Sequence, residues 1–362
     1  MSPPVNHNPP VSVVGVGTST ALGRTAPSSA AAVRAGISAF GEHPYLINKV
    51  GEPTIVARAS YLSGDAAAIE RFIKLALPAA KEALAPLAGL VGNFQTIPVI
   101  LGLPAERPGI PGGFGSQLAE RFQDLEEGSS RISSLEMIPH GHAAGLMALE
   151  AGYRKIQNGS FDFCLVGGID SYLEPETLEW LEEGDQLHSS NNPWGFVPGE
   201  AAGFCLLTSC RFAERYNLPV LGRVLAVSTA YEKNLIKTGA VCTGKGLSEV
   251  VQKVLPALPA PDARVDQTIC DLNGEPYRAD EFGFTAARTS ERFVAATEFL
   301  APADCWGDVG AASGPLFVSL AAAASLKGYA KGPHTLIWTS SEGGERTAAL
   351  LRSEVRPRVA PL

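Results

Sequence analysis

The sequence lacks the features that mark several classes of protein. Its six cysteines include no Cys-x-x-Cys pair, which argues against a zinc ribbon or a dithiol redox motif and favours buried, reduced thiols. It has no long block of Lys or Arg, and its formal net charge is -8, so neither nucleic acid nor an anionic membrane is expected as the main partner. No apolar run reaches the roughly 18 residues that a membrane-spanning helix needs.

Length and composition are those of a globular protein. Hydrophobic residues make up 45% of the 362 positions and charged residues 18%, which is enough apolar material for one large domain or two medium ones. Residues 1–10 are rich in Pro and Asn and contain no apolar segment of the kind that a signal peptide requires. We therefore expect a cytoplasmic protein with a disordered tail at 1–10 and a frayed tail at 356–362.

Two features of the sequence weakly suggest a cofactor or metal site, but neither leads us to expect a cofactor or a metal. The predicted strand Val11–Gly17 ends in a Gly-x-Gly pair, but position 20 is Thr where a dinucleotide-binding motif needs its third glycine. The segment Glu174–Asp185 is acidic, and such a charge run is more typical of a solvent-facing helix surface than of a metal site.

The stretch Ile138–Ser171 is the most informative part of the chain. A short turn leads into a helical pattern in which apolar side chains recur at spacings of three and four. Phe161–Val166 then has the composition of a buried strand, which Gly167–Gly168 is expected to end. Two histidines, His140 and His142, lie where the helix begins, and the start of a helix in a cleft is a position that can hold a reactive side chain.

Strands and helices alternate along the rest of the chain. Apolar periodicity predicts helices at 66–87, 116–125, 247–255, 279–293 and 314–326, and strands at 96–103, 204–207, 220–227, 267–272, 335–338 and 348–351. This alternation predicts parallel-rich sheets covered by helices. Because the pattern restarts near Leu218–Pro219, we expect two halves, 11–215 and 216–355.

Four segments of the chain are especially informative: Arg71–Leu84, Leu149–Gly168, Gly195–Gly203 (GFVPGEAAG) and Gly307–Gly314. They resemble segments of the β-ketoacyl synthases, the condensing enzymes of the thiolase-like fold. The resemblance extends from about Val11 to Leu351. It implies an α/β fold of two duplicated βαβ halves with layers in the order α-β-α-β-α. It also implies a homodimer formed through the N-terminal half.

The resemblance further implies that the catalytic side chains of the family are missing here. A condensing enzyme uses a cysteine nucleophile and two histidines. The cysteine position falls on His142, and the two histidine positions fall on Asn273 and Asp308. A lysine of the family, five residues before the second histidine, falls on Ala303. The small residues around these positions match while the catalytic side chains differ, which indicates the fold without the condensing chemistry.

The gate of the acyl pocket is also changed. The family has a Gly-Phe-Gly-Gly motif whose Phe closes the pocket, and the matching residues are Ser341, Glu342, Gly343 and Gly344. The gate residue is therefore Glu342. An ionised carboxylate is poorly suited to seal an apolar tunnel.

Two interpretations of the replaced site stay open at this point. If the fold holds, the replacement residues should converge on one cleft, where they either bond one another and fill it or form a rebuilt site. In a rebuilt site, His142 paired with Asp308 or Glu342 would act as a general base. Cys164 and Cys305 do not match the nucleophile position, and buried inert thiols are expected there.

The resemblance favours a protein that works by binding. Degenerate members of this fold pair with an active ketosynthase, as chain-length factors do, or accompany type VI secretion effectors and their adaptors. The partner expected is therefore a ketosynthase, an acyl carrier protein or a secretion effector. The alternative is an enzyme, an acyltransferase or thioester hydrolase that acts on acyl-CoA or acyl-carrier substrates around His142.

Overall fold

A computed structural model describes residues 10–62, 68–88, 90, 96–123 and 131–354. The predicted tails at 1–10 and 356–362 fall outside these ranges, apart from residue 10. The described chain forms one nine-stranded sheet, in the order β5-β4-β6-β7-β1-β8-β11-β10-β9, and a separate hairpin of β2 and β3. Every helix within the described ranges is too short or too polar to span a bilayer.

The strands of the sheet are β1 (Val11–Thr20), β4 (Thr96–Gly102), β5 (Arg131–Ile138), β6 (Phe163–Ser171), β7 (Glu200–Ser209), β8 (Gly222–Tyr231), β9 (Gln267–Cys270), β10 (His334–Ser340) and β11 (Glu345–Ser353). The hairpin consists of β2 (Phe40–Ile47) and β3 (Pro53–Ala57). The α-helices are α1 (Ala26–Arg34), α2 (Ala68–Leu84), α3 (Phe114–Phe122), α4 (Ala144–Gln157), α5 (Pro175–Glu183), α6 (Cys210–Arg215), α7 (Lys245–Val254), α8 (Pro276–Thr289), α9 (Ala303–Trp306) and α10 (Ser313–Leu326).

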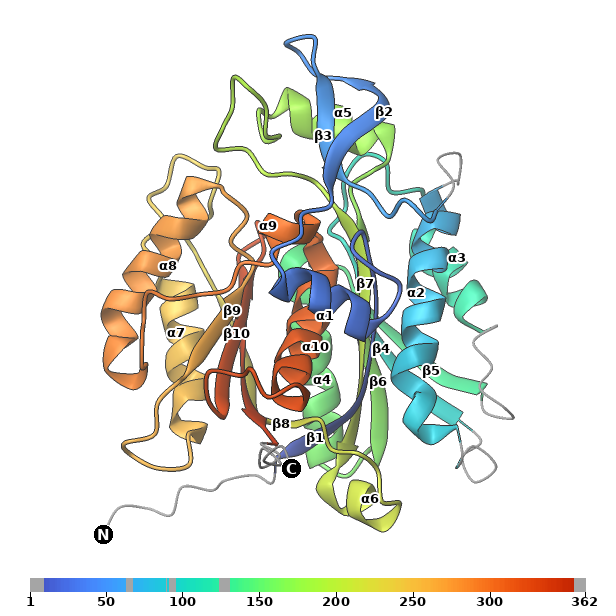
Figure 1. The fold of residues 1–362 in the computed structure, drawn as a ribbon, viewed down its shortest axis with the longest axis vertical. Helices are drawn as coiled ribbons and strands as arrows, with labels where there is room; N and C mark the ends of the chain where they lie inside the picture. The colour runs from blue at the N-terminus through green and yellow to red at the C-terminus, as the bar shows by residue number, and fades with distance from the viewer. Residues whose placement is uncertain (1–9, 63–67, 89, 91–95, 124–130, 355–362) are drawn as a thin grey trace, which may run out of the picture.

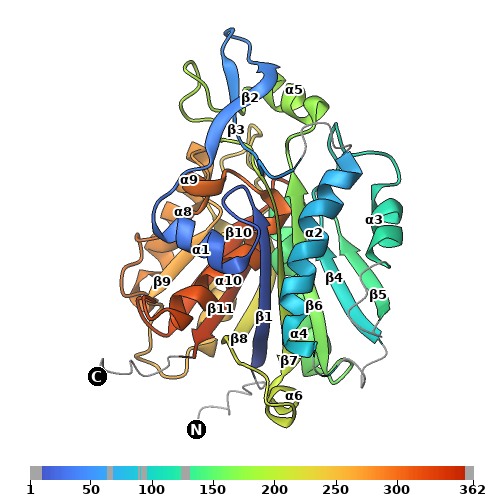
Figure 2. The ribbon, with the colours of Figure 1, turned by 45° about the vertical axis from the view of Figure 1, so that its right-hand side comes forward.

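The helices form three layers (Figures 1 and 2). The middle layer lies between two groups of strands, β5-β4-β6-β7-β1 and β8-β11-β10-β9, and an outer layer covers each group. Helix α4 packs on β6 and β8, and α10 packs on β7 and β10, so both lie between the two groups of strands. Helix α2 covers the outer face of β1 and β7, and α7 covers the outer face of β8 and β11. The predicted α/β fold with α-β-α-β-α layers is confirmed.

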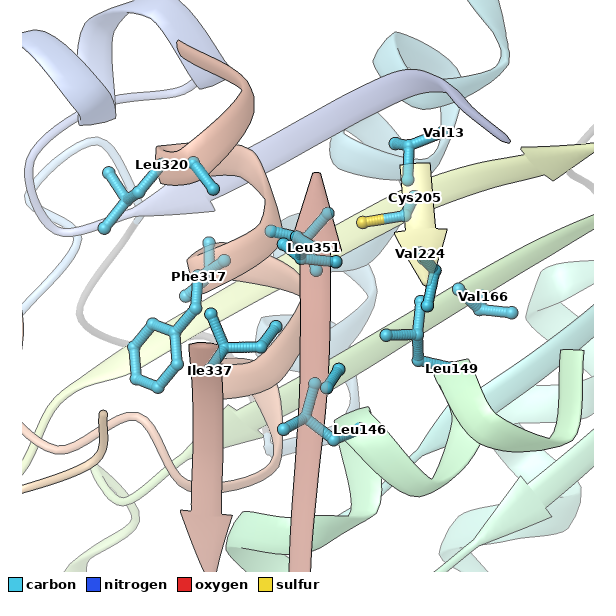
Figure 3. Close-up of a cluster of buried hydrophobic side chains, with 14 of the residues drawn as sticks. Val13, Leu146, Leu149, Val166, Cys205, Val224, Phe317, Leu320, Ile337 and Leu351 are labelled. Atoms are coloured by element: carbon cyan, nitrogen blue, oxygen red, sulfur yellow. The ribbon is translucent and has the colours of Figure 1, made fainter. Parts of the chain in front are cut away.

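The character of each helix follows from its place in these layers. Helix α10 has the sequence SGPLFVSLAAAASL, without a charged residue, and almost all of it is buried, as expected for a helix enclosed on every side. Helix α7 is amphipathic and buries one face only. The central core joins residues from both groups of strands, such as Val166 and Cys205 with Val224 and Leu351, around Leu146 (Figure 3).

The prediction of parallel-rich sheets is wrong. Three strand pairs are parallel, β4–β5, β4–β6 and β9–β10. The other five pairs of the nine-stranded sheet are antiparallel, as is the β2–β3 hairpin. Strand β11 returns directly beside β10, and β7 lies antiparallel beside β6 although helix α5 separates the two in sequence. An alternation of elements in the sequence does not fix strand direction when such returns are present.

The prediction that Gly167–Gly168 ends the strand before it is also wrong. Strand β6 continues through both glycines to Ser171 and is buried throughout. A Cβ atom at Gly168 would lie 2.1 Å from the carbonyl oxygen of Ala311, and one at Gly167 would lie 2.3 Å from the ring of Phe204. Gly168 therefore allows close packing of the strand against the segment that leads into α10, and Gly167 leaves room for the Phe204 ring of the neighbouring strand β7.

Most other predicted elements are present within a few residues of their expected ends. The prediction that Glu174–Asp185 is a solvent-facing surface is confirmed, because its acidic side chains are exposed or half-buried on and around α5. Glu200, in the GFVPGEAAG segment, is wholly buried and forms an ion pair with Arg71, with its Oε2 2.5 Å from the Arg71 Nε. No prediction was made for the β2–β3 hairpin, for the edge strand β5 or for the short helices α1, α6 and α9.

Candidate functional site

His142 lies in a short 3-10 helix, Gly141–Ala143, that leads directly into α4. The turn before it depends on Gly141, whose φ of 68° lies in the left-handed region that glycine adopts without strain. The backbone N–H of Ala143 donates a hydrogen bond to the Ser341 hydroxyl at 2.8 Å. That hydroxyl donates to the carbonyl oxygen of His140. The loop after β10 therefore holds the start of α4 in place.

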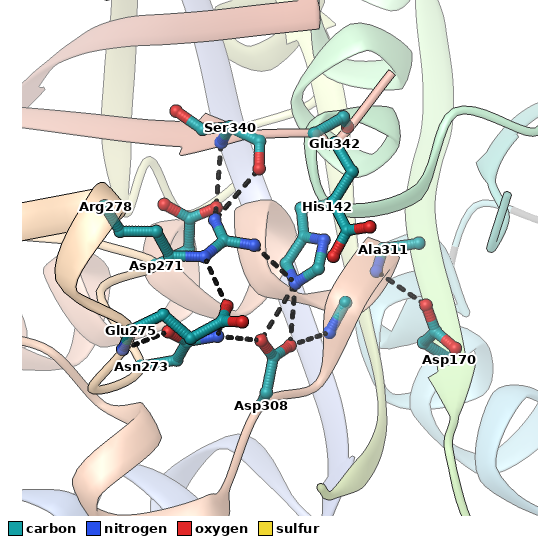
Figure 4. Close-up of polar contacts among 12 residues, drawn as sticks. His142, Asp170, Asp271, Asn273, Glu275, Arg278, Asp308, Ala311, Ser340 and Glu342 are labelled. Atoms are coloured by element: carbon teal, nitrogen blue, oxygen red, sulfur yellow. Dashed lines mark hydrogen bonds and ion pairs between the residues drawn. The ribbon is translucent and has the colours of Figure 1, made fainter. Parts of the chain in front are cut away.

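The side chain of His142 points at Asp308 (Figure 4). Its Nε2 lies 2.9 Å from each carboxylate oxygen of Asp308, and both side chains are buried. The carboxylate also accepts hydrogen bonds from the Asn273 amide at 2.7 Å and from the backbone N–H of Gly310 at 2.9 Å. The structure thus brings together the three positions that the resemblance assigns to the catalytic Cys and two His.

The pKa values of this pair move in opposite directions. Burial alone lowers the pKa of His142, but the Asp308 carboxylate outweighs burial and leaves that pKa above its ordinary value of 6.5. Burial alone raises the pKa of Asp308, but attraction to His142 and Arg278, together with the donated hydrogen bonds, places it well below its usual range. Asp308 is therefore ionised at neutral pH.

Arg278, on α8, completes the network, although nothing in the sequence marked it. Its side chain is 1% exposed. Its Nη1 donates to the Asp271 carboxylate at 3.1 Å and to the Ser340 carbonyl at 2.9 Å, and its Nε lies 3.3 Å from Glu275 Oε2. Burial lowers the pKa of Arg278, but the surrounding acidic groups raise it well above its ordinary value. The guanidinium therefore stays charged.

The contacts of Arg278 and Asp308 determine the proton position on His142. The Arg278 Nη2 lies 3.2 Å from His142 Nε2, and a guanidinium can only donate. The ionised Asp308 carboxylate can only accept, and it lies closer to Nε2 than Arg278 does. We therefore place a proton on Nε2, which donates it to Asp308. The contact with Arg278 then brings two N–H donors together. The other ring nitrogen, Nδ1, is left as the one that could exchange a proton with a ligand.

Glu342, at the family's gate position, is tied to a lysine. Its Oε1 contacts the Nζ of Lys237, which also contacts the Gln186 side chain and lies 3.1 Å from Glu275 Oε1. Lys237 belongs to the loop between β8 and α7. Gly343 and Gly344 follow in the turn between β10 and β11. The residue at the family's gate position is therefore part of a charged cluster.

A cavity of about 240 Å³ opens beside His142, and its lining includes Arg107, Tyr172, Phe196 and Glu342. The Arg107 guanidinium lies over the Tyr172 ring, 4.2 Å from its centroid, and its Nη2 donates to Asp170 Oδ1 at 2.6 Å. Sequence reasoning missed Arg107 and Lys237 because arginine and lysine in loops are normally solvent-exposed. The cavity combines aromatic walls with a buried cation.

Among the described residues that line this cavity there is no cysteine. Cys305 is buried, and burial raises the pKa of its thiol. Burial raises the pKa of Cys164 to about 12. Both fit the expectation of buried, unreactive thiols, because the thiolate is the reactive form. A hydrogen-bonded His–Asp pair beside a cavity is nevertheless able to hold or move a proton at His142 Nδ1.

The sequence is similar to known proteins over part of the chain. Residues 141–213 match the family model for the N-terminal domain of β-ketoacyl synthases. Over 155 residues the chain is 25% identical to the fatty acid synthase subunit alpha of Emericella nidulans, a match that covers 38% of this chain and 9% of that much longer protein.

Solved structures share the fold over almost the whole chain. A chain from a complex of a type II PKS acyl-carrier protein with its ketosynthase bound to the hexaketide has a TM-score of 0.78 and 15% identity, and the match covers 96% of this chain and 99% of that one. The ishigamide ketosynthase/chain length factor gives 0.69 and 21%, with 95% and 99% covered. A β-ketoacyl synthase from Burkholderia phymatum STM815 gives 0.74 and 15%, again with 95% and 99% covered. Residues 141–213 therefore match the N-terminal domain of the β-ketoacyl synthases, and almost the whole chain shares the fold of solved ketosynthase structures.

Proposed function

We propose that this protein keeps the ketosynthase fold without the condensing chemistry and works by binding a protein partner. The observation that carries the proposal is the contact between His142 and Asp308 at 2.9 Å. The position of the family's nucleophile is thus taken by the imidazole of His142, whose Nε2 is held in a network of ion pairs. Without a thiol there, no acyl group can be carried as a thioester of the protein.

The charge at the second replaced position also opposes condensation. In a condensing enzyme, the two histidines stabilise negative charge that develops on the substrate oxygen. Asp308 is itself an anion, since its pKa lies well below the usual range, with burial opposing that shift and His142 and Arg278 producing it. A fixed carboxylate repels a developing oxyanion. Asn273 could donate a hydrogen bond, but its amide is already engaged by Asp308 and by Glu275, at 2.7 and 2.9 Å.

The partner that the comparisons favour is a ketosynthase or an acyl carrier protein. The similar structures are described as a ketosynthase with its acyl-carrier protein and as a ketosynthase/chain length factor, so surfaces for such partners exist on this fold. Association with a type VI secretion effector is the second setting that the fold allows, and it requires the same absence of condensing chemistry. In both settings the protein contributes a binding surface.

We also propose that the protein forms a homodimer through its N-terminal half. Among the described strands, β5 stands at one end of the sheet and pairs with β4 alone. A second copy of β5 related by a two-fold axis would continue the sheet and pair the backbone groups along that edge. Light scattering should then give a mass close to twice 37.9 kDa. A mass of 37.9 kDa over the micromolar range would contradict the dimer.

Hydrolysis of a thioester is the second candidate function, and the cavity beside His142 is the observation that favours it. With Asp308 bound to Nε2, the Nδ1 atom could accept a proton from a water molecule that attacks a bound thioester carbonyl. The cavity of about 240 Å³ leaves room for the end of an acyl chain rather than for a complete coenzyme.

One experiment separates the two functions. The purified protein is incubated with a panel of acyl-CoA and acyl-carrier thioesters, covalent adducts are sought by mass spectrometry, and release of the free thiol is followed in parallel. We expect neither adduct nor release above the uncatalysed rate. Turnover that saturates with substrate and is lost in His142→Ala would establish the hydrolase instead. An adduct on a cysteine would overturn both proposals.

A further inference from the structure

A second cluster of polar side chains lies in the C-terminal part of the chain and does not line the cavity. Glu232 directly follows β8, Cys242 lies in the loop between β8 and α7, and Glu281 is on α8. One ligand atom from each side chain lies within 4.8 Å of the other two. The Cys242 Sγ is 3.8 Å from Glu281 Oε1. Residues 49 positions apart at the extremes thus meet at one point.

The two carboxylates of this cluster are buried with too little positive charge. Glu232 is 2% exposed and Glu281 is 0% exposed. The Arg346 Nε lies 2.6 Å from Glu281 Oε1 and supplies one positive charge. Among the described residues, the hydrogen-bond donors to Glu232 are the backbone N–H groups of Asn234 and Gly246. Two buried carboxylates and one guanidinium leave one negative charge uncompensated, which is costly in a protein interior.

One oxygen of Glu281 has no hydrogen-bond partner within the part of the chain that the structure describes. Its Oε2 is buried and unsatisfied, although Oε1 of the same carboxylate contacts Arg346. Buried carboxylate oxygens are normally satisfied, so an isolated one calls for a missing partner. A cation beside Oε2 would supply that partner and balance the buried charge at the same time.

We propose that Glu232, Cys242 and Glu281 form a binding site for a zinc ion. One thiolate and two carboxylates are ligands that zinc accepts at four-coordinate sites, with water as the fourth ligand. A thiolate ligand disfavours magnesium and calcium, which prefer oxygen donors and higher coordination numbers. Cys242 is half-buried, so the cluster is open to an entering ion from its side. Binding replaces the S–H bond with a Zn–S bond, and the thiol proton leaves to solvent.

A bound zinc ion would act on the loop that closes the cleft. Glu232 and Cys242 bracket the segment that carries Lys237, whose Nζ lies 3.1 Å from Glu275 Oε1 and also contacts Glu342. The Arg346 bound to Glu281 donates through Nη1 to the Ser341 carbonyl at 2.6 Å. The ion would therefore pin both ends of the Lys237 loop and connect it to the segment that holds the start of α4. This role is independent of the proposed partner binding.

The test measures zinc affinity in the full chain after removal of metal with a chelator. Zinc is titrated in competition with a chromophoric chelator, and we expect one ion per chain and at least tenfold weaker binding in Cys242→Ser. The matched control is Cys210→Ser, which removes the other half-buried thiol and should bind as the parent does. Binding unchanged in Cys242→Ser, or no binding by the parent protein, would overturn the proposal.

A second measurement guards against loss of folding in the variants. Glu281→Gln leaves Arg346 without its buried partner and can unfold the protein, so Cys242→Ser carries the test. Zinc should raise the melting temperature of the parent and of Cys210→Ser and leave Cys242→Ser unchanged, because a ligand that binds only the folded state stabilises it. Zinc binding that is lost in His142→Ala and kept in Cys242→Ser would place the ion in the cleft and refute this site.

Discussion

The Nε2 atom of His142 lies 2.9 Å from both carboxylate oxygens of Asp308, across a sequence separation of 166 residues. His142 lies just before α4 and Asp308 lies just before α10, and these are the two helices of the central layer. Their ion pair therefore links the two segments that lead into these central helices (Figure 4). The protonation of each residue depends on the other, and both affect stability.

The first prediction concerns stability as a function of pH. The pKa of His142 is raised in the folded state, with burial opposing and Asp308 producing the shift. Its contribution to stability is therefore complete below pH 6.5 and is lost as pH rises through the folded pKa. The pKa of Asp308 is lowered, so its contribution is complete above pH 3.8 and is lost on acidification. We expect the free energy of unfolding in urea to be highest between about pH 4 and 6.5.

The control for this prediction is His142→Gln. A glutamine amide can still donate to Asp308 but does not titrate, so the decline of the unfolding free energy above pH 6.5 should become shallower in this variant. The same slope in parent and variant would show that His142 does not carry a raised pKa.

The second prediction concerns the buried charge of Asp308. Replacing it with Ala removes the anion that pairs with His142, while Arg278 keeps its contacts with Asp271 and Glu275. Removal of one partner from a buried ion pair typically costs about 3–5 kcal/mol. Asp308→Asn keeps a side chain that can accept and donate hydrogen bonds, and it should cost clearly less than Asp308→Ala. Urea unfolding at pH 6 measures both. Equal losses in the two variants would mean that packing, rather than charge, dominates at this position.

Local pattern was sufficient for most elements of this fold and insufficient for the sheet. The helix at α4 and the strand at β6 follow from apolar spacing. The direction of β11 beside β8 depends on pairing over more than 100 residues, which no local pattern contains. The prediction that Gly168 ends the strand was wrong because Ala311, whose close approach requires a glycine there, reaches it only in the folded protein. The division of the chain into 11–215 and 216–355 stays a prediction.

The candidate site was predictable at the positions that match the motifs of the family. The resemblance located His142, Asn273 and Asp308 because the small residues around them are shared. It could not locate Arg278, which lies on the outer helix α8 and is nevertheless buried by the acidic groups it neutralises. An arginine in an amphipathic helix normally faces solvent, so its role is visible only once Asp271 and Glu275 are placed beside it.

The third prediction concerns the packing of β6 against the central layer. In Gly168→Ala the new Cβ would lie 2.1 Å from the backbone oxygen of Ala311, and backbone on both sides must then separate. We expect a loss of about 1–3 kcal/mol, the usual cost of overpacking a core, measured by urea unfolding. Gly112→Ala is the matched control, because no atom lies within 4 Å of the Cβ position there, and it should change stability little. Equal stability of Gly168→Ala and the parent would contradict the described packing.

The fourth prediction concerns the reactivity of the six thiols. Cys210 and Cys242 are half-buried and the other four are buried. In Cys164, for example, burial raises the thiol pKa to about 12. A disulfide reagent at pH 8 should therefore label two thiols in the folded protein and the remaining four only after denaturation, because the thiolate must form and be reached.

Single Cys→Ser variants at positions 210 and 242 should each remove one of the rapidly labelled thiols. Rapid labelling of Cys305 would have a larger consequence. It would show a reachable thiol only three residues from Asp308 and would reopen cysteine chemistry in the cleft. Slow labelling of Cys305 leaves His142 as the residue at the nucleophile position, and with it the argument that this protein binds rather than condenses.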